Sequence, residues 1–235
     1  MTMGAKDGRR RFPVRRLVVA GTVAIVLTVA LGWVWFSWLP SYRPSLRQGE
    51  RYGIDVSSHQ GRIEWDRVGK DDISFAYIKA TEGGDFVDSR FSENWTDAMA
   101  AGLNRGAYHF FTLCAGGEQQ ARNFLRVVPA SADAMPPAVD LELAGNCRAR
   151  PDRAAVAREL GAFLTMVERA VGHDAVLYVG DDFEARYRIR GSIERPLWIR
   201  RFLLRPSVSG WDIWQVSSFA RVDGVSGRVD LDVSR

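Results

Sequence analysis

The sequence has little of what metal and redox sites require. Its 235 residues include only two cysteines and three histidines, with no CxxC pair and no His-rich run at the spacing of metal ligands. It also has no internal repeat and no low-complexity tract. The length is normal for a single α/β barrel. We therefore expect a globular domain that binds neither a metal nor another cofactor.

Excess positive charge is confined to the N-terminus. The whole chain has a formal net charge of +4, and residues 1–16 contribute six basic side chains and one acid, Asp7. The rest of the chain therefore carries −1. Because a nucleic-acid-binding domain needs a basic surface, this partition argues against nucleic acid as a partner.

One long apolar run, "LVVAGTVAIVLTVALGWVWFSWL", extends from Leu17 to Leu39 without a charge. About 20 such residues in a helix span a bilayer, and Trp33, Trp35 and Trp38 suit the far interface. A cleaved signal peptide would have a shorter apolar core and a small-residue cleavage site, so we favour an uncleaved anchor. The basic flank then places residues 1–16 in the cytoplasm, and the remainder in the periplasm or outside the cell. We expect a single-pass protein of the cell membrane.

After a polar linker over residues 40–51, residues 52–235 read as one domain of alternating strands and helices. The predicted strands are 53–57, 75–81, 106–111, 138–143, 175–180, 197–202, 211–217 and 229–234. Helical patterns lie near 63–68, 93–101, 118–127 and 152–171. Strands joined by helices imply a parallel sheet, and the absence of a helical pattern among the last three strands indicates a barrel without its final helices. A doubly wound open sheet is the rival, although the first strand is followed by "VSSHQGR" rather than a glycine-rich phosphate loop.

Two carboxylates lie in the apolar stretch "PPAVDLELAG". Since a strand has a period of two, Asp140 and Glu142 share one face, with Cα atoms ~6.6–7 Å apart, and the valine and leucines share the other. The apolar face packs on helices, so the acidic face points into the barrel, where such folds place their sites. The same reasoning assigns further inward side chains: Asp55, Tyr77, Lys79, Thr81, Tyr108, Phe110, Tyr178, Trp198, Trp214 and Asp230. His109 has the opposite parity and is expected to make a structural hydrogen bond.

Several carboxylates among aromatic rings suit glycoside hydrolysis, in which a protonated acid meets the leaving oxygen and aromatic rings stack on sugars. Two alternatives are a buried ion pair between the acids and Lys79, and a metal site that adds His59 and His109. The spacing matches no compact ligand motif, which disfavours the metal.

Seven stretches of the chain resemble glycoside hydrolase family 25, the Chalaropsis-type lysozymes. They are "GIDVSSHQG", "FAYIKATEGGDFVDSRF", "GLNRGAYHFF", "AVDLELAG", "LWIRRF", "WQVSS" and "GRVDLDV", in family order from Gly53 to Val233. The resemblance implies a modified TIM-like (β/α)5(β)3 barrel. It also implies hydrolysis of the β-1,4 bond between N-acetylmuramic acid and N-acetylglucosamine in peptidoglycan.

Carried over by motif, Glu142 matches the general acid/base and Asp140 its partner, which would orient the substrate's acetamido group. Asp55 and Asp230 match two further aspartates of the site. Relatives often have Asn where this chain has Asp232, so parity leaves open whether Asp230 or Asp232 faces the site. The substrate-binding residues that we expect are Tyr108, Phe110, Lys79, Tyr178, Trp198, Trp214 and Gln215.

Cys114 follows the third strand and Cys147 the fourth, so their loops should be neighbours and a disulfide is expected between them in an exported domain. Two other functions remain open: a non-catalytic peptidoglycan-binding module, and a hydrolase of chitin-like glycans. We expect the protein to act as a monomer on glycan strands.

Overall fold

The computed structural model describes residues 14–207 and 209–235, and it divides the chain into two units, residues 1–41 and 42–235. In the first unit, α1 (Val14–Trp33), the π-helical segment η1 (Val34–Trp38) and α2 (Leu39–Ser41) follow one another without a break. The basic tail predicted for residues 1–16 lies almost wholly outside the described residues.

This N-terminal helix is apolar and exposed. The stretch Val18–Ser41 has a mean hydropathy of 2.2, and no residue of its most apolar window is buried within the protein. A helix of 24 residues is long enough to cross a bilayer. An apolar N-terminal helix is therefore present where the sequence predicts one, and it fits either a membrane anchor or a signal sequence.

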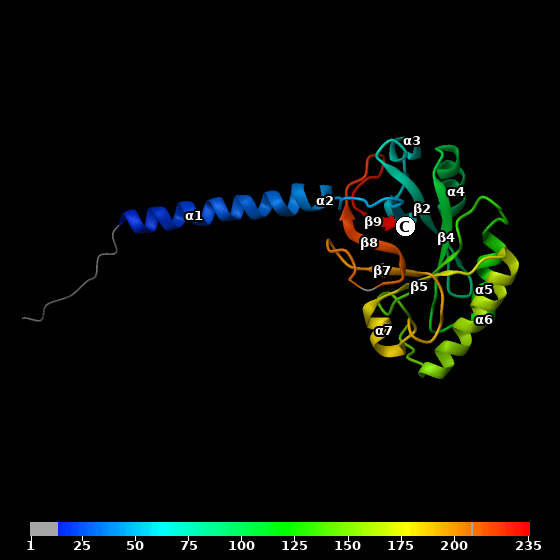
Figure 1. The fold of residues 1–235 in the computed structure, drawn as a ribbon. Coiled ribbons are helices and arrows are strands. Elements are labelled where there is room, and N and C mark those ends of the chain that lie inside the picture. Colours follow the sequence, from blue (N-terminus) through cyan, green and yellow to red (C-terminus); the bar gives the residue numbers. More distant parts are fainter. Residues whose placement is uncertain (1–13, 208) are drawn as a thin grey trace, which may run out of the picture. The chain divides into compact units, whose positions relative to one another are not determined.

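The second unit is a closed barrel (Figure 1). Its strands are β1 (Arg51–Val56), β2 (Ile73–Glu82), β4 (Asn104–Phe110), β5 (Ala138–Leu141), β6 (Val176–Val179), β7 (Leu197–Arg200), β8 (Trp211–Ala220) and β9 (Val229–Ser234). Neighbouring strands from β1 through β8 are parallel, and β9 closes the ring antiparallel to both β8 and β1. The predicted eight-stranded barrel is confirmed. One short strand was not predicted: β3 (Phe86–Val87) pairs with the end of β2.

Helices cover the outside of the strands (Figure 1). They are α3 (Trp65–Val68), α4 (Phe91–Ala100), α5 (Gly117–Val127), α6 (Arg153–Val171) and α7 (Asp181–Tyr187), with a 3-10 turn η2 (Ser58–Gln60). The first four lie where helical patterns predict them. The fifth, α7, was not predicted because seven residues are too few to show a helical period. As expected, the described residues between β7, β8 and β9 form no helix.

The alternation predicted for β5 is confirmed. Val139 and Leu141 are completely buried in the core between strands and helices, while Asp140 on the other face remains partly accessible. Burial of the apolar side chains at about 25 cal/mol per Å² fixes the strand's orientation, since a slip of one residue would put both carboxylates into this core.

His109 is buried on the outer face of β4 and makes structural contacts, as expected. Its Nδ1 lies 2.7 Å from Thr81 Oγ1, and its Nε2 lies 3.0 Å from Gln120 Oε1. The Phe163 ring is stacked on the imidazole. Burial lowers the pKa of His109 to about 4, so the ring is neutral. Thr81 was expected to point inward. An irregularity in the pairing of β2 with β4 between Lys79 and Thr81 shifts the parity and turns Thr81 toward His109.

The segment predicted to be a linker is bonded to the barrel. Arg43 donates to the backbone oxygen and the carboxylate of Asp71, both at 2.6 Å, and Arg205 donates to the Glu50 carboxylate and to Ser45 O. The compact unit accordingly begins at Tyr42, before the first residue of β1, Arg51. We call residues 42–50 the strap.

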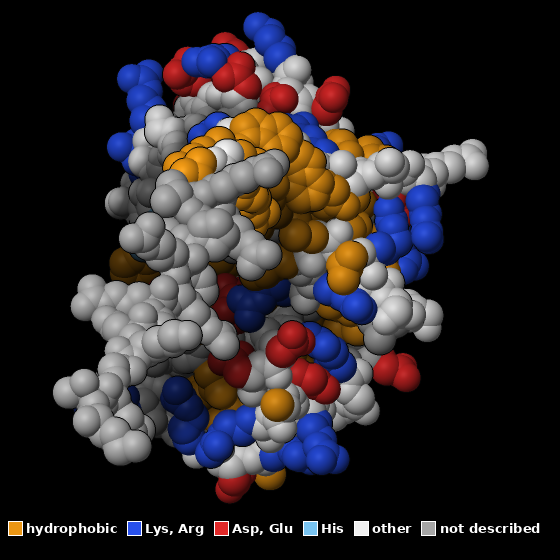
Figure 2. Space-filling view, turned by 90° about the vertical axis from the view of Figure 1, so that its left-hand side faces the viewer, with side chains coloured by type: hydrophobic (Ala, Val, Ile, Leu, Met, Phe, Trp, Pro, Cys, Tyr) orange, Lys and Arg blue, Asp and Glu red, His pale blue; other side chains and the backbone are white. Residues whose placement is uncertain are grey.

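Two surface features complete the barrel. Cys114, after β4, and Cys147, after β5, form a disulfide, with Cα atoms 6.2 Å apart. On the part of the face in Figure 2 that described residues form, Lys and Arg side chains and Asp and Glu side chains lie among one another.

Candidate active site

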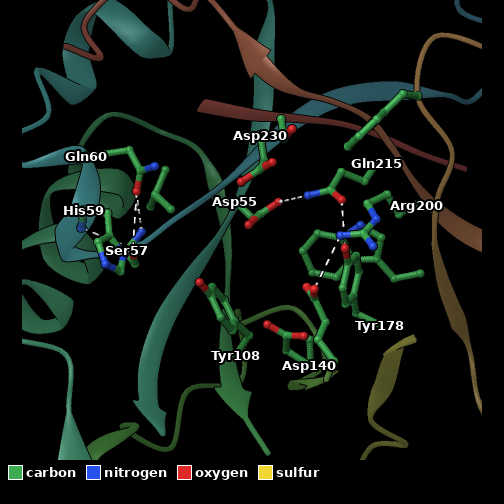
Figure 3. Close-up of a pocket in the computed structure, with 16 residues that line it drawn as sticks. Asp55, Ser57, His59, Gln60, Tyr108, Asp140, Tyr178, Arg200, Gln215 and Asp230 are labelled. Carbon is green, nitrogen blue, oxygen red and sulfur yellow. Dashed lines mark hydrogen bonds and ion pairs between the residues drawn. The ribbon is translucent and has the colours of Figure 1, made fainter. Parts of the chain in front are cut away.

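A pocket of about 320 Å³ opens at the carboxyl ends of the barrel strands (Figure 3). The four carboxylates singled out in the sequence line it together: Asp55, Asp140, Glu142 and Asp230. They come from β1, β5 and β9, which are distant in sequence and are brought together by barrel closure. The other lining residues are Val56, Ser57, His59, Gln60, Tyr108, Ala138, Tyr178, Trp198, Arg200, Phe202, Gln215 and Ser218.

Asp55 and Asp230 occupy opposite positions on the antiparallel pair β1 and β9. Both point into the pocket in Figure 3. Asp232, two residues further along β9, has the same parity but lies deeper: its side chain is completely buried, and the Trp198 indole donates to its Oδ1 at 3.0 Å. Of the two aspartates that parity could not separate, Asp230 is the one that reaches the pocket.

Asp140 and Glu142 project from the end of β5. The Glu142 Oε2 lies 3.4 Å from a guanidinium nitrogen of Arg200. The Asp140 side chain lines the pocket, and its Oδ1 is buried with no hydrogen-bond partner among the described residues.

Burial and mutual repulsion raise the pKa of every carboxyl in the pocket. For Asp140 the causes are burial and the neighbouring Glu142, opposed by Lys79 and Arg200. Burial also raises the pKa of Glu142, and Arg200 limits the rise. Burial and Glu142 raise the pKa of Asp230 to about 7. A raised pKa extends to higher pH the range in which a carboxyl keeps its proton, which is what a general acid needs.

Four predicted substrate-binding residues line the pocket: Tyr108, Tyr178, Trp198 and Gln215. Tyr178 donates its hydroxyl hydrogen to Gln215 Oε1 at 2.9 Å, and Gln215 Nε2 donates to Asp55 Oδ2 at 3.3 Å. Figure 3 shows this chain of side chains along one wall. It ties the orientation of Asp55 to that of an aromatic side chain on another strand.

Lys79 and Phe110 lie beside the pocket rather than in its wall. The Lys79 ammonium is 2.7 Å from Glu82 Oε2 and 5.1 Å from the centre of the Phe110 ring. Its positive charge nevertheless lowers the pKa of Asp140. Lys79 therefore affects the charge state of Asp140 without lining the pocket.

Trp214 does not belong to the pocket, and we remove it from the substrate-binding set. Its ring is completely buried on the outer face of β8, where its Nε1 donates to Arg201 O at 2.7 Å. The reason is the strand period: Gln215 points into the pocket, so its neighbour Trp214 must point away.

Arg200 is the main residue that the sequence analysis missed. It lines the pocket two residues after Trp198, so the period of two already places both on the inner face. Ser57, His59, Gln60, Phe202 and Ser218 also line the pocket without having been predicted. They lie in loops or at strand ends, where no period applies.

No group of three or more His, Cys, Asp or Glu side chains within residues 14–207 and 209–235 is arranged to hold a metal ion. His59 is an exposed residue of the pocket wall, with its Nδ1 2.9 Å from Ser57 Oγ. His109 is on the opposite face of the sheet, so the two histidines do not converge on the acids.

Comparison with known proteins places this site in a family. The family model described as glycosyl hydrolases family 25 matches residues 54–225. Lysozyme M1 of Streptomyces globisporus is 35% identical over 210 residues, covering 76% of this chain and 65% of that protein. The protein YegX of Escherichia coli strain K12 is 39% identical over 190 residues, covering 77% and 68%.

Solved structures agree with the sequence comparisons. A family 25 glycosyl hydrolase from Bacillus anthracis superposes with a TM-score of 0.74 at 35% identity, covering 82% of this chain and 92% of that one. A lysozyme from Streptomyces coelicolor gives a TM-score of 0.70 at 33% identity, covering 79% and 92%. With four carboxylates converging in the pocket of a barrel of this kind, the chain belongs to family 25 of the glycosyl hydrolases and is a glycoside hydrolase.

Proposed function

We propose that the protein is a membrane-anchored muramidase. It hydrolyses the β-1,4 bond between N-acetylmuramic acid and N-acetylglucosamine in peptidoglycan. The support is the family, which includes relatives named lysozyme, together with a pocket that combines acids, aromatic rings and hydrogen-bonding side chains.

Glu142 is the general acid/base in this proposal. The observation that carries the assignment is its position: it lines the pocket, its pKa is raised by burial, and Arg200 lies 3.4 Å from it. A carboxyl whose pKa is raised keeps its proton to higher pH and can give it to the leaving glycosidic oxygen. Once ionised, it is held by Arg200 and can take a proton from the attacking water.

Asp140 orients the substrate. Its carboxylate lines the pocket and can accept a hydrogen bond from the N–H of a substrate acetamido group. An acetamido group positioned in this way can attack the sugar carbon itself, so that the protein supplies no nucleophile; such substrate assistance is a known route in glycoside hydrolysis. Asp55 and Asp230 lie opposite each other on β1 and β9. When ionised, they stabilise the positive charge that develops on the sugar ring in the transition state.

The sugar rings would lie against Tyr108, Tyr178 and Trp198. Aromatic rings offer apolar faces to the C–H groups of a sugar. The Tyr108 hydroxyl and the Gln215 amide can form hydrogen bonds with the hydroxyl groups of the sugar. These side chains come from β4, β6, β7 and β8, so the barrel itself fixes the shape of the binding wall.

The apolar N-terminal helix supports a location at the membrane. With residues 17–39 in the bilayer and residues 1–16 in the cytoplasm, the barrel lies on the side of the membrane where peptidoglycan is found.

The test is the activity of Glu142→Gln in the full-length protein, purified in detergent and incubated with peptidoglycan. The matched control is Glu118→Gln, which makes the same chemical change on the exposed face of α5. We expect Glu142→Gln to lose at least about a hundredfold in rate, as is typical for loss of a general acid, and the control to keep its activity. A fully active Glu142→Gln would refute the assignment. A wild-type protein that binds glycan without cleaving it would instead favour a peptidoglycan-binding module.

A further inference from the structure

A fifth carboxyl lies directly beneath the four that line the pocket. Asp232 of β9 is opposite Gly53 of β1, two positions below the pair formed by Asp55 and Asp230. A Cβ at Gly53 would lie 2.3 Å from the Phe75 ring, so no side chain can fill the space there. Asp232 therefore occupies the layer of the barrel interior next to Asp55, completely buried.

The two oxygens of Asp232 have different partners. Oδ1 accepts the 3.0 Å hydrogen bond from the Trp198 indole. Oδ2 is buried and accepts no hydrogen bond from an N–H or hydroxyl O–H group of the described residues. Its neighbour is the carboxyl of Asp55, and the two side chains are within hydrogen-bonding reach. Two ionised carboxylates are both acceptors and cannot bond to each other, whereas one proton between them satisfies both.

The surroundings favour that proton. Burial raises the pKa of both Asp55 and Asp232, and repulsion from Asp230 raises both further. The other titratable groups that face the pair from the neighbouring strands are Asp140, Tyr77, Tyr108 and Tyr178. Among the described residues, no Lys or Arg compensates the charge of Asp232; the cations of the site, Lys79 and Arg200, act on Asp140, and Arg200 also on Glu142 and Asp230.

We propose that Asp232 is a positioning residue for Asp55: the two carboxyl groups share one proton, so that one donates an O–H···O hydrogen bond to the other and the pair carries a single negative charge. Asp55 is then held from two sides, by this bond and by the 3.3 Å bond from Gln215 Nε2. The catalytic consequence rests on the proposed function, in which Asp55 stands beside the reacting sugar. Asp232 itself touches no substrate and acts through Asp55.

The experiment follows the carboxyl groups themselves. Full-length protein in detergent, with aspartate labelled with carbon-13 at its side-chain carboxyl, is titrated by NMR, and Asp55→Asn and Asp232→Asn identify the two signals. Because coupled sites lose their protons in two macroscopic steps, we expect both wild-type signals to show the same two midpoints, the second of them above the ordinary aspartate range. Separate midpoints in the ordinary range would overturn the proposal.

Asp232→Asn supplies the second readout. The amide still accepts from Trp198 and can donate to Asp55, so the fold and the single negative charge of the pair should be retained. The midpoint of Asp55 should fall by about one pH unit or more, because it titrates alone. The exposed Asp97→Asn on α4 is the control and should leave that midpoint unchanged.

A residue with only a structural role would leave the Asp55 midpoint where it was in Asp232→Asn, and that result would contradict the shared proton. The titration does not depend on turnover. If the wild-type protein shows the coupled titration but cleaves no glycan, the shared proton stands and the proposed function fails.

Discussion

The Arg200 guanidinium lies 3.4 Å from Glu142 Oε2, at the mouth of a barrel in which carboxyl groups outnumber cations. Arg200 lowers the pKa of Glu142, Asp140 and Asp230 against burial, which raises all three. It therefore sets the pH range over which Glu142 can both give and take a proton.

Replacing Arg200 with Gln should move the alkaline limb of the kcat/KM profile to higher pH, because Glu142 then keeps its proton longer. At the optimum we expect a loss of about tenfold, or about 1.4 kcal/mol, since a weaker acid protonates the leaving oxygen less readily. The measurement is a pH–rate profile on solubilised peptidoglycan fragments. Arg201→Gln, an exposed neighbour, is the control; an alkaline limb that stays in place in Arg200→Gln would show that Arg200 does not govern the acid.

The Cys114–Cys147 disulfide should stabilise the barrel chiefly by restricting the unfolded chain. For a sequence separation of 33 residues the expected contribution is about 3–4 kcal/mol. Denaturant unfolding of the double variant Cys114→Ala, Cys147→Ala should show that loss, and added reductant should then have no further effect. Free thiols at both positions in non-reducing mass mapping of the exported protein would contradict the bond.

His109 should make the barrel sensitive to mild acid. Its pKa is about 4 in the folded protein, below the ordinary value of 6.5, because burial disfavours the charged ring. A lowered histidine pKa contributes stability that is complete above pH 6.5 and is lost as the pH falls toward 4. The difference corresponds to about 3 kcal/mol of unfolding free energy.

The check is the free energy of unfolding at pH 7 and pH 4 for wild type, His109→Gln and His173→Gln. His109→Gln should be less stable than wild type at pH 7, but that gap should close toward pH 4. The exposed His173 at the end of α6 serves as the control. A gap between His109→Gln and wild type that is the same at both pH values would mean that His109 is not held neutral in the fold.

The strap should depend on Arg205. Burial alone would raise the pKa of Glu50, but hydrogen bonds and charge from Arg205 and Arg47 lower it, so the folded barrel favours the ionised carboxylate. Arg205→Ala removes that partner and should cost about 1–3 kcal/mol. Trypsin should then cut between residues 42 and 51 faster than in wild type, whereas the exposed Arg221→Ala should not change the rate. Equal cleavage rates in Arg205→Ala and wild type would mean that other contacts hold the strap.

The period of two in buried strands is what made the site predictable from sequence. It placed Asp140 and Glu142 on the inner face, and applied to Trp198 it would also have found Arg200. The prediction failed at Thr81, where the pairing of β2 with β4 is irregular. It also failed at Trp214, which was assigned to the pocket together with Gln215 although adjacent residues of a strand point to opposite faces. The α7 helix and the strap carry no periodic signal, because the first is short and the second is extended chain held by single side chains.

The depth of Asp232 could not be read from sequence either. Its parity equals that of Asp230, and the pairing of β9 with β1 puts Asp230 opposite Asp55 in the pocket and Asp232 opposite Gly53 beneath it. Charge states follow from such burial and from contacts between distant strands, so the sequence names the acids of this site without ordering their pKa values.

The most direct test of the proposed reaction is the chemistry of the ends that it creates. Full-length protein in detergent is incubated with purified peptidoglycan, and the released fragments are reduced and analysed by mass spectrometry. A muramidase leaves N-acetylmuramic acid at every new reducing end, and Glu142→Gln should release none. Reducing-end N-acetylglucosamine, or cleavage of chitin oligosaccharides in preference to peptidoglycan, would contradict the proposed bond.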